Sequence, residues 1–288
     1  MSPYQSEILT QLEQASTDAL DSLLAALPDA CQQIADEVRD FIAGLDKSKA
    51  GRINPTGINL KRVDAFRKTL DKIVASKQYG QAIEGFLAEF GRASKLIDLY
   101  FGTVVSSFNP AKAAYAAIRQ SNIETTVTSL LGSGVDANFK DPIVKLLKQN
   151  IAGNSDSRAL QELMRNEILG TPTTSPVLTR YVKQVSNDSL YQYESNYLQA
   201  VSNDLELAHY FYQGTVIGDS RDFCAQRTGK YYTDEQVKSW GNLHWAGQIK
   251  GTNSSNILTN RGGHFCKHLI IPVSKALYDL QAKKGKAG

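Results

Sequence analysis

Apolar residues recur at intervals of three and four through most of the chain before Gly214, and this spacing is the strongest constraint on the fold. Because an α-helix turns once in about 3.6 residues, the spacing places these side chains on one helical face. Further stripes run from Val63 to Val74 and from Ile83 to Tyr100. The sequence therefore predicts helices over this part of the chain. One of the clearest stripes consists of Ile34, Val38, Phe41, Ile42 and Leu45.

Two consecutive helices are predicted from their capping residues. The first covers residues 155 to 169, with Ser155 or Ser157 as its N-cap and Gly170 at its C-cap position. The second covers residues 176 to 213, and it would be about 57 Å long at a rise of 1.5 Å per residue. Its many tyrosines fit core packing better than a base-stacking surface, because no basic row accompanies them.

The composition changes after Gly214. All four histidines, both tryptophans and two of the three cysteines lie between residues 209 and 268, where glycine is also frequent. Residues 230 to 232 predict a strand, the segment TDEQ predicts a capped short helix, and residues 264 to 273 predict a second strand. This part of the chain is therefore expected to form a small α+β module.

The predicted fold class is mainly α, with helical N-terminal and central regions, a long helix and a small α+β C-terminal module. Residues 1–110 are expected to form a helical region that is a candidate docking domain. Residues 111–214 form a helical region ending in the long helix, residues 215–276 form the module, and residues 277–288 form a basic tail.

The charge of the chain is nearly balanced, with 32 basic and 29 acidic residues. Such a balance does not by itself indicate nucleic-acid binding. The short basic tail carries Lys283, Lys284 and Lys286. It is interpreted first as a solvated, frayed end, and alternatively as a weak contact with nucleic-acid phosphates.

The N-terminal segment MSPYQSEILT lacks the basic and apolar regions of a signal peptide. No apolar stretch approaches the roughly 20 residues needed to span a bilayer. We therefore expect folding in a reducing cytoplasm and no membrane partner. Three scattered cysteines are also too few for a disulfide framework.

Four residues of the module are candidates for a site. His264, Cys266 and His268 alternate, so on a strand they would share one face, and the fold could bring Cys224 beside them. Three alternatives follow. A cluster of buried thiols, with histidines bonded to backbone or to acids such as Asp219 or Asp222, is favoured; a zinc site and a Cys224–Cys266 disulfide are the others.

The spacing of these residues argues against a strong zinc motif. Positions i and i+4 on a strand lie about 13 Å apart, so three same-face ligands would be strained around one ion. The paired Cys-x-x-Cys spacing of many zinc sites is also absent. No cofactor is therefore expected, and zinc is kept as an alternative.

Motifs for catalysis are weak. The sequence has no nucleophile elbow, no H-E-x-x-H, no Walker loop and no dinucleotide-binding glycine motif. A Cys266–His264 pair would have only Gly262-Gly263 as an oxyanion feature. The stretch from Asn260 to His264 suggests a metal-dependent nuclease, but no set of metal-binding carboxylates surrounds it. The chain is therefore predicted not to be an enzyme.

Three segments occur in an order and spacing that carry a family resemblance: Gly218–Cys224, Arg227–Glu235 and Gly262–His268, followed by Pro272-Val-Ser. With the two helices upstream, they resemble the C-terminal module of Mu F-like head-morphogenesis proteins over roughly residues 120 to 275. The motif residues are Asp219, Arg221, Gly229, Lys230, Gly262 and Gly263. The chain departs from the family in having a lone Cys224 in place of Cys-x-x-Cys, and in closing the module with His268 rather than cysteine.

The resemblance implies a minor capsid protein of a tailed bacteriophage that associates with the portal protein at the portal vertex during procapsid assembly. Capsid or scaffold protein and double-stranded DNA are further partners that it implies, with a role in DNA packaging or delivery. The expected location is the virion, and the host cytoplasm during assembly. The alternatives are a metal-dependent nuclease-like enzyme and an internal, ejected DNA-binding virion protein.

Overall fold

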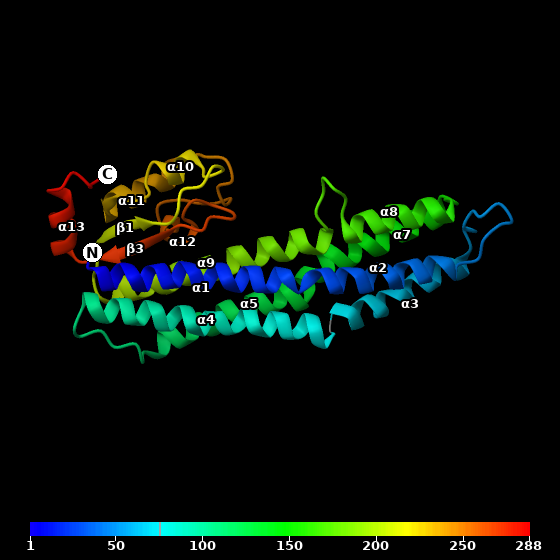
Figure 1. Cartoon of the computed structure of the whole chain (residues 1–288), viewed down its shortest axis with the longest axis horizontal. Helices are drawn as coiled ribbons and strands as arrows, with labels where there is room; N and C mark the ends of the chain where they lie inside the picture. Colours follow the sequence, from blue (N-terminus) through cyan, green and yellow to red (C-terminus); the bar gives the residue numbers. More distant parts are fainter. Residues whose placement is uncertain (75) are drawn as a thin grey trace. The chain divides into compact units, whose positions relative to one another are not determined.

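The computed structural model describes residues 1–74 and 76–288. Over these residues the chain is mainly helical with a small α+β region near the C-terminus, as the sequence predicts (Figure 1). The strands of this region form a three-stranded antiparallel sheet, whereas the sequence predicted two strands. The chain divides into two compact units, each made of segments far apart in sequence. Unit 1 comprises residues 1–19, 87–124 and 186–288, and unit 2 comprises residues 20–86 and 125–185.

The boundaries between the two units fall within four helices. The four domain ranges predicted from the sequence are not tested by this division and stay predictions. The four helices are α1 (Pro3–Ala25), α4 (Lys77–Val104), α5 (Ala113–Leu131) and α9 (Val177–Asp204). In the described residues, no helix combines the length and apolar character that crossing a bilayer requires.

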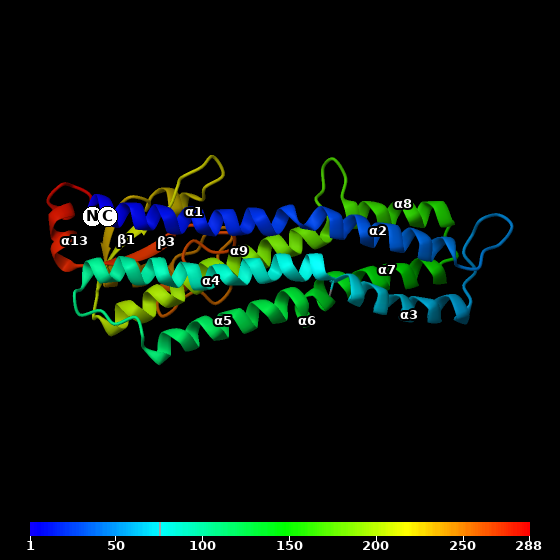
Figure 2. The ribbon, with the colours of Figure 1, turned by 60° about the horizontal axis from the view of Figure 1, so that its bottom comes forward.

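Unit 2 is built from amphipathic helices. Helix α2 packs against α8 and α3, and α3 packs against α7, as the two views show (Figures 1 and 2). Ile34, Val38 and Ile42 of the predicted stripe are buried, and Phe41 stacks on Phe66 with ring centroids 4.5 Å apart. The helices that lie wholly in unit 2 are α2 (Leu27–Ala43), α3 (Gly57–Val74), α6 (Ser133–Val135), the π-helical η1 (Asp136–Lys140), α7 (Asp141–Ala152) and α8 (Ser157–Leu169).

The N-cap of α8 differs from the prediction. Asp156, not Ser155 or Ser157, accepts hydrogen bonds from the backbone amides of Arg158 and Ala159, at 2.9 and 3.0 Å. Ser155 instead bonds Asn150, and Ser157 already lies within the helix. Gly170 takes the predicted C-cap position, with φ 79°.

The long helix is shorter than predicted. Helix α9 ends at Asp204, so its 28 residues span about 42 Å. Glu206 adopts a φ of 53°, and the amide of Leu207 bonds the carbonyl of Ser202 at 2.9 Å. This is the hydrogen-bond pattern of a Schellman motif, here with a glutamate where glycine is usual. The prediction of helix through residue 213 was wrong because the chain turns here and continues as a strand.

The sheet of unit 1 has the order β2-β1-β3, with β1 antiparallel to both neighbours. Its strands are β1 (His209–Gln213), β2 (Tyr231–Thr233) and β3 (Leu269–Val273). The strand predicted over residues 264 to 273 therefore forms only in its second half. Pro272 lies within β3, which an edge strand tolerates because the missing amide is not needed for pairing.

Both faces of this sheet are covered. On one face, Tyr210 and Tyr212 join a buried apolar cluster with Phe223 and Trp240. On the other, Tyr100 of α4 donates a hydrogen bond to the carbonyl of Pro272 at 2.8 Å. The side chains of Tyr191, Tyr193 and Tyr197 in α9 are also buried, which confirms that these tyrosines pack in the core.

The remaining elements surround the sheet. Thr233 and Gln236 form the predicted capping box at the start of α11. The basic tail is not frayed along its backbone, because Ala287 forms a parallel bridge with Tyr231 and Lys286 accepts from the Tyr231 amide at 3.0 Å. The short elements are α10 (Asp222–Ala225), α11 (Asp234–Ser239), the 3₁₀ turn η2 (Trp240–Asn242), α12 (Ile257–Asn260) and α13 (Lys275–Ala282).

Candidate functional site

Three of the four predicted site residues meet in the core of the module. Cys224 lies on α10, whereas Cys266 and His268 lie on the segment that leads into β3. The two sulfurs are 3.9 Å apart, and the Cys266 Sγ lies 3.8 Å from Nδ1 of His268. One ligand atom from each residue falls within 4.8 Å of the others, and all three side chains are buried.

His264 does not belong to this cluster. Residues 264 to 268 do not form a strand, and Phe265 has a φ of 57°, so the predicted alternation of faces fails here. The Nδ1 of His264 lies 3.1 Å from a carboxylate oxygen of Asp188, whose other oxygen accepts from the Phe265 amide at 2.7 Å. The partner of His264 is thus Asp188 on α9, not Asp219 or Asp222. No sequence motif marked Asp188.

The two adjacent glycines of the motif have separate steric roles. A Cβ at Gly262 would lie 2.4 Å from the sulfur of Cys224 and 2.7 Å from that of Cys266. Gly263 has a φ of 99°, and a Cβ there would lie 2.1 Å from the carbonyl oxygen of Gly247. Because neither position accommodates a side chain, the Gly262-Gly263 pair lets the loop close over the two sulfurs. This is a packing role, not an oxyanion site.

Polar groups surround the cluster. The hydroxyl of Tyr212 donates to the Cys224 sulfur at 3.4 Å, and the guanidinium of Arg261 donates to the Cys266 carbonyl at 3.1 Å. The hydrogen bond from Cys224 lowers the pKa of the Cys266 thiol, whereas this bond and burial raise the pKa of Cys224. Within the described part of the chain, the Nε2 of His268 has no hydrogen-bond partner.

The other predicted motif residues hold the module together or lie on its surface. Arg221 donates to the His264 carbonyl at 2.6 Å, and its guanidinium packs where a side chain at Gly247 would lie. Gly229 has a φ of 80° and bonds the carbonyl of Tyr212. The surface residues of the predicted set are Asp219, Lys230, Lys283, Lys284 and Lys286.

The burial of the cluster limits its chemistry. Cys224 and Cys266 are each 2% exposed and His268 is 6% exposed, so a macromolecular substrate cannot reach them in this conformation. The donor set suits metal ligation or packing. Half-buried His264 with Asp188 is a more accessible pair, but this carboxylate also fixes the backbone at Phe265, which indicates a structural role.

A buried acid that sequence analysis did not identify lies elsewhere in unit 1. Glu194 of α9 is fully buried and accepts a hydrogen bond from Ser16 of α1. Burial raises the pKa of Glu194 to about 8, an effect that Ser16 and the charge of Arg261 partly offset. Its position among apolar residues of α9 gave no signal in the sequence, because a glutamate in a helix is ordinarily solvated.

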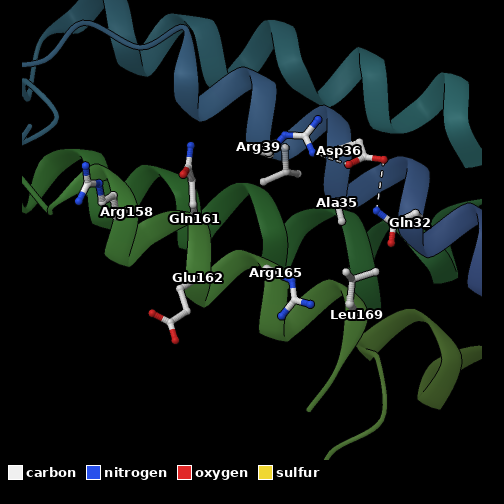
Figure 3. A pocket seen from close by; sticks show the side chains of 10 residues that line it. Gln32, Ala35, Asp36, Arg39, Arg158, Gln161, Glu162, Arg165 and Leu169 are labelled. Carbon is white, nitrogen blue, oxygen red and sulfur yellow. Dashed lines mark hydrogen bonds and ion pairs between the residues drawn. The ribbon is translucent and has the colours of Figure 1, made fainter. Parts of the chain in front are cut away.

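A groove in unit 2 lies between α2 and α8 (Figure 3). Its charged residues include Asp36, Arg39, Arg158 and Arg165. Asp36 accepts from both Arg39 and Gln32, at 2.8 and 3.2 Å, and the side chains of Asp36 and Arg39 are largely exposed. The charged side chains of the groove thus form local ion pairs at the surface of unit 2.

No protein-family model matches this chain, and neither a curated protein nor a solved structure matches it. A functional proposal therefore depends on the residues and their geometry.

Proposed function

We propose that this chain is a minor head protein of a tailed bacteriophage, which associates with the portal vertex during procapsid assembly and carries out no catalysis. One observation carries the proposal. The motif segments that resemble Mu F-like proteins are far apart in sequence, yet Cys224, Gly262 and Cys266 meet in one buried core. Such a meeting is expected if the segments are parts of one module rather than a chance set of short matches.

The surroundings of the motif support a structural module. Arg227 lies 3.9 Å from the centre of the Phe223 ring and donates to the Phe223 carbonyl at 2.7 Å. Gly229 and Lys230 bond the backbone of Tyr212, so the second motif segment lies directly beside β1. In these contacts the motif residues pack against their neighbours and fix the path of the backbone. The proposal of a non-enzymatic protein follows from this use and from the burial of the thiols.

Association with the portal is tested by producing phage particles from the genome that encodes the chain. We expect the full chain in purified procapsids and virions by mass spectrometry, and a complex with the portal protein when the two are co-expressed. Deleting the gene should lower the yield of DNA-filled heads. Particles that lack the chain, with no loss of filled heads on deletion, would contradict the proposal.

The partly exposed His264–Asp188 pair is the one observation that favours the nuclease alternative. Full-length chain is incubated with double-stranded DNA and Mg²⁺, Mn²⁺ or Zn²⁺. We expect no cleavage above that of a His264→Ala, His268→Ala double variant. Cleavage that this double variant loses, and that a His244→Ala control keeps, would establish the nuclease. His244 is the matched control because it is exposed and outside the cluster.

The ejected DNA-binding alternative depends on Lys283, Lys284 and Lys286, whose side chains are exposed although the backbone of the tail is docked. Phosphate contacts release counterions, so such binding would weaken steeply with salt. We expect the triple alanine variant to bind DNA no more weakly than a control with Lys61, Lys68 and Lys72 replaced. A salt-sensitive loss confined to the tail variant would favour this alternative.

A further inference from the structure

We propose that Cys224, Cys266 and His268 form a binding site for a Zn²⁺ ion within the C-terminal module, and that His264 is not part of it. This site differs from the sequence expectation, in which His264 shared a strand face with the two later residues. It does not depend on the proposed role in phage assembly, because all three ligands belong to the module itself.

The spacing of the ligand atoms fits tetrahedral zinc. Two sulfurs bound at about 2.3 Å and at the tetrahedral angle lie about 3.8 Å apart, and a sulfur and a nitrogen lie about 3.6 Å apart. The corresponding separations here are 3.9 Å between the two sulfurs and 3.8 Å between Cys266 Sγ and His268 Nδ1. Two of the three ligand separations thus match those that an ion would require, and the third, between Cys224 and His268, is within 4.8 Å.

The charges of the site also fit. Two thiolates and one neutral imidazole balance the charge of a divalent cation, so the complex is neutral where all three side chains are buried. A buried ion without such compensation would be strongly unfavourable. On binding, each cysteine thiol releases its proton to solvent, so two protons leave for each ion that enters. Cysteine and histidine are the ligands that zinc prefers in proteins.

The arrangement of the three side chains favours a metal ion over a disulfide. His268 presents its Nδ1 to the Cys266 sulfur at 3.8 Å, whereas its Nε2 has no hydrogen-bond partner among the described residues. A disulfide between the cysteines would need the sulfurs to approach from 3.9 Å to about 2.05 Å, and it would leave the histidine unused. Metal binding uses all three side chains.

Groups next to the ligands are placed as an outer shell. The Tyr212 hydroxyl donates to the Cys224 sulfur, and Arg261 holds the carbonyl of Cys266. Hydrogen bonds of this kind orient metal ligands and tune their affinity. Gly262 leaves room beside both sulfurs, because any side chain there would collide with them. Three protein ligands leave the fourth coordination position of a tetrahedral ion open.

The first test measures metal content in the full-length protein purified without chelator and dialysed against Zn²⁺. We expect about one bound Zn²⁺ per chain. Cys224→Ala and His268→Ala should each reduce it to background, whereas His264→Ala and Cys31→Ala should leave it unchanged. Cys31 is the matched control for a buried thiol because it lies in unit 2, near Thr179.

A second measurement on the wild-type chain keeps the proposal testable if a variant fails to fold. Co²⁺ replaces Zn²⁺, and we expect the absorption of thiolate-to-cobalt charge transfer together with the intense visible bands of four-coordinate cobalt. Zn²⁺ should also protect Cys224 and Cys266, but not Cys31, from alkylation in partly denaturing conditions.

Several outcomes would overturn the proposal. They are a wild-type chain that binds no Zn²⁺, a cobalt spectrum without thiolate bands, and binding that survives in both Cys224→Ala and His268→Ala. Loss of binding in His264→Ala equal to that in His268→Ala would likewise overturn it. A disulfide between Cys224 and Cys266 in protein purified under reducing conditions, found by peptide mass, would do the same.

Discussion

The two units use buried polar groups differently. In unit 2, fully buried Asn59 donates to the carbonyls of Asp46 and Asn54 and accepts from the Asp46 amide, so its polar atoms are satisfied. In unit 1, Glu194, Arg261 and His268 are buried and each has one side-chain atom without a hydrogen-bond partner among the described residues. The buried amide of Asn59 thus serves the fold of unit 2, whereas unit 1 contains a buried acid, Glu194, whose charge state affects its stability.

The largest expected effect is a pH dependence that belongs to unit 1. Burial raises the pKa of Glu194 to about 8 from an ordinary value of 4.5. The folded state then binds more protons than the unfolded state between these values. Stability from this group is therefore complete below about pH 4.5 and is lost as the pH rises toward 8. Each pKa unit corresponds to about 1.4 kcal/mol, which sets an effect of a few kcal/mol.

Glu194→Gln removes this titration while keeping an acceptor for Ser16. We expect the variant to differ little from wild type near pH 5 and to be more stable by a few kcal/mol near pH 8.5. Urea denaturation at both pH values measures the difference, and Glu162→Gln on the exposed face of α8 is the control. The charge of Arg261, which favours ionised Glu194, makes the effect smaller. If the free energy of unfolding depended on pH equally in wild type and in Glu194→Gln, Glu194 would not be a pH-sensitive group of unit 1.

The next effect concerns the glycine between the two sulfurs. Gly262→Ala places a methyl group against Cys224 and Cys266, and overpacking of this kind costs about 1–3 kcal/mol. Gly85→Ala is the matched change in unit 2, since the position is an exposed helical one with open space around it. It should stabilise the chain by up to about 1 kcal/mol. In thermal melts we expect a lower Tm for Gly262→Ala and a higher Tm for Gly85→Ala. An unchanged Tm in Gly262→Ala would show that the loop shifts to accommodate the methyl group.

Much of unit 2 could be predicted because its helices follow from local pattern. The stripe of Ile34, Val38 and Ile42 marks the buried face of α2, and Thr233 with Gln236 likewise marked the start of α11 in unit 1. The failures arose where non-glycine residues adopt positive φ, at Glu206 and Phe265. Such conformations are uncommon for these residue types. At Phe265 a distant residue, Asp188, holds the backbone amide, whereas Glu206 ends its helix through local bonds. No local pattern announces them.

The candidate site was predicted in part for the same reason. Cys224, Cys266 and His268 were identified because their residue types suit one another. The exclusion of His264 depends on Asp188, which is distant in sequence and holds the Phe265 amide. The sequence could therefore predict that Cys224, Cys266 and His268 meet. It could not predict that His264 turns away, because the path of the backbone at this point is fixed by contacts with α9.

A comparison of two buried cysteines tests whether the module is the more sensitive region. Cys266→Ser places a hydroxyl among Cys224, His268 and Tyr212, and we expect a loss of about 2 kcal/mol, because these groups are left poorly paired. Cys31→Ser in α2 can bond Thr179, whose hydroxyl lies 4.0 Å from the sulfur, and should cost about 1 kcal/mol. Thermal melts of both variants in reducing buffer decide the order, which a larger loss in Cys31→Ser would reverse.

The smallest expected effect lies in unit 2 and concerns a cap that the sequence placed on the wrong residue. Asp156 satisfies two amides at the start of α8, and its carboxylate has a lowered pKa because the backbone amide of Ala159 donates to it. Asp156→Ala should therefore lower the free energy of unfolding more than Ser157→Ala, which removes no capping bond. Urea denaturation of the two variants measures this. A larger loss of stability in Ser157→Ala would show that the N-cap is Ser157, one of the two serines that the sequence pattern indicated. The start of α8 would then have been predicted correctly from the sequence.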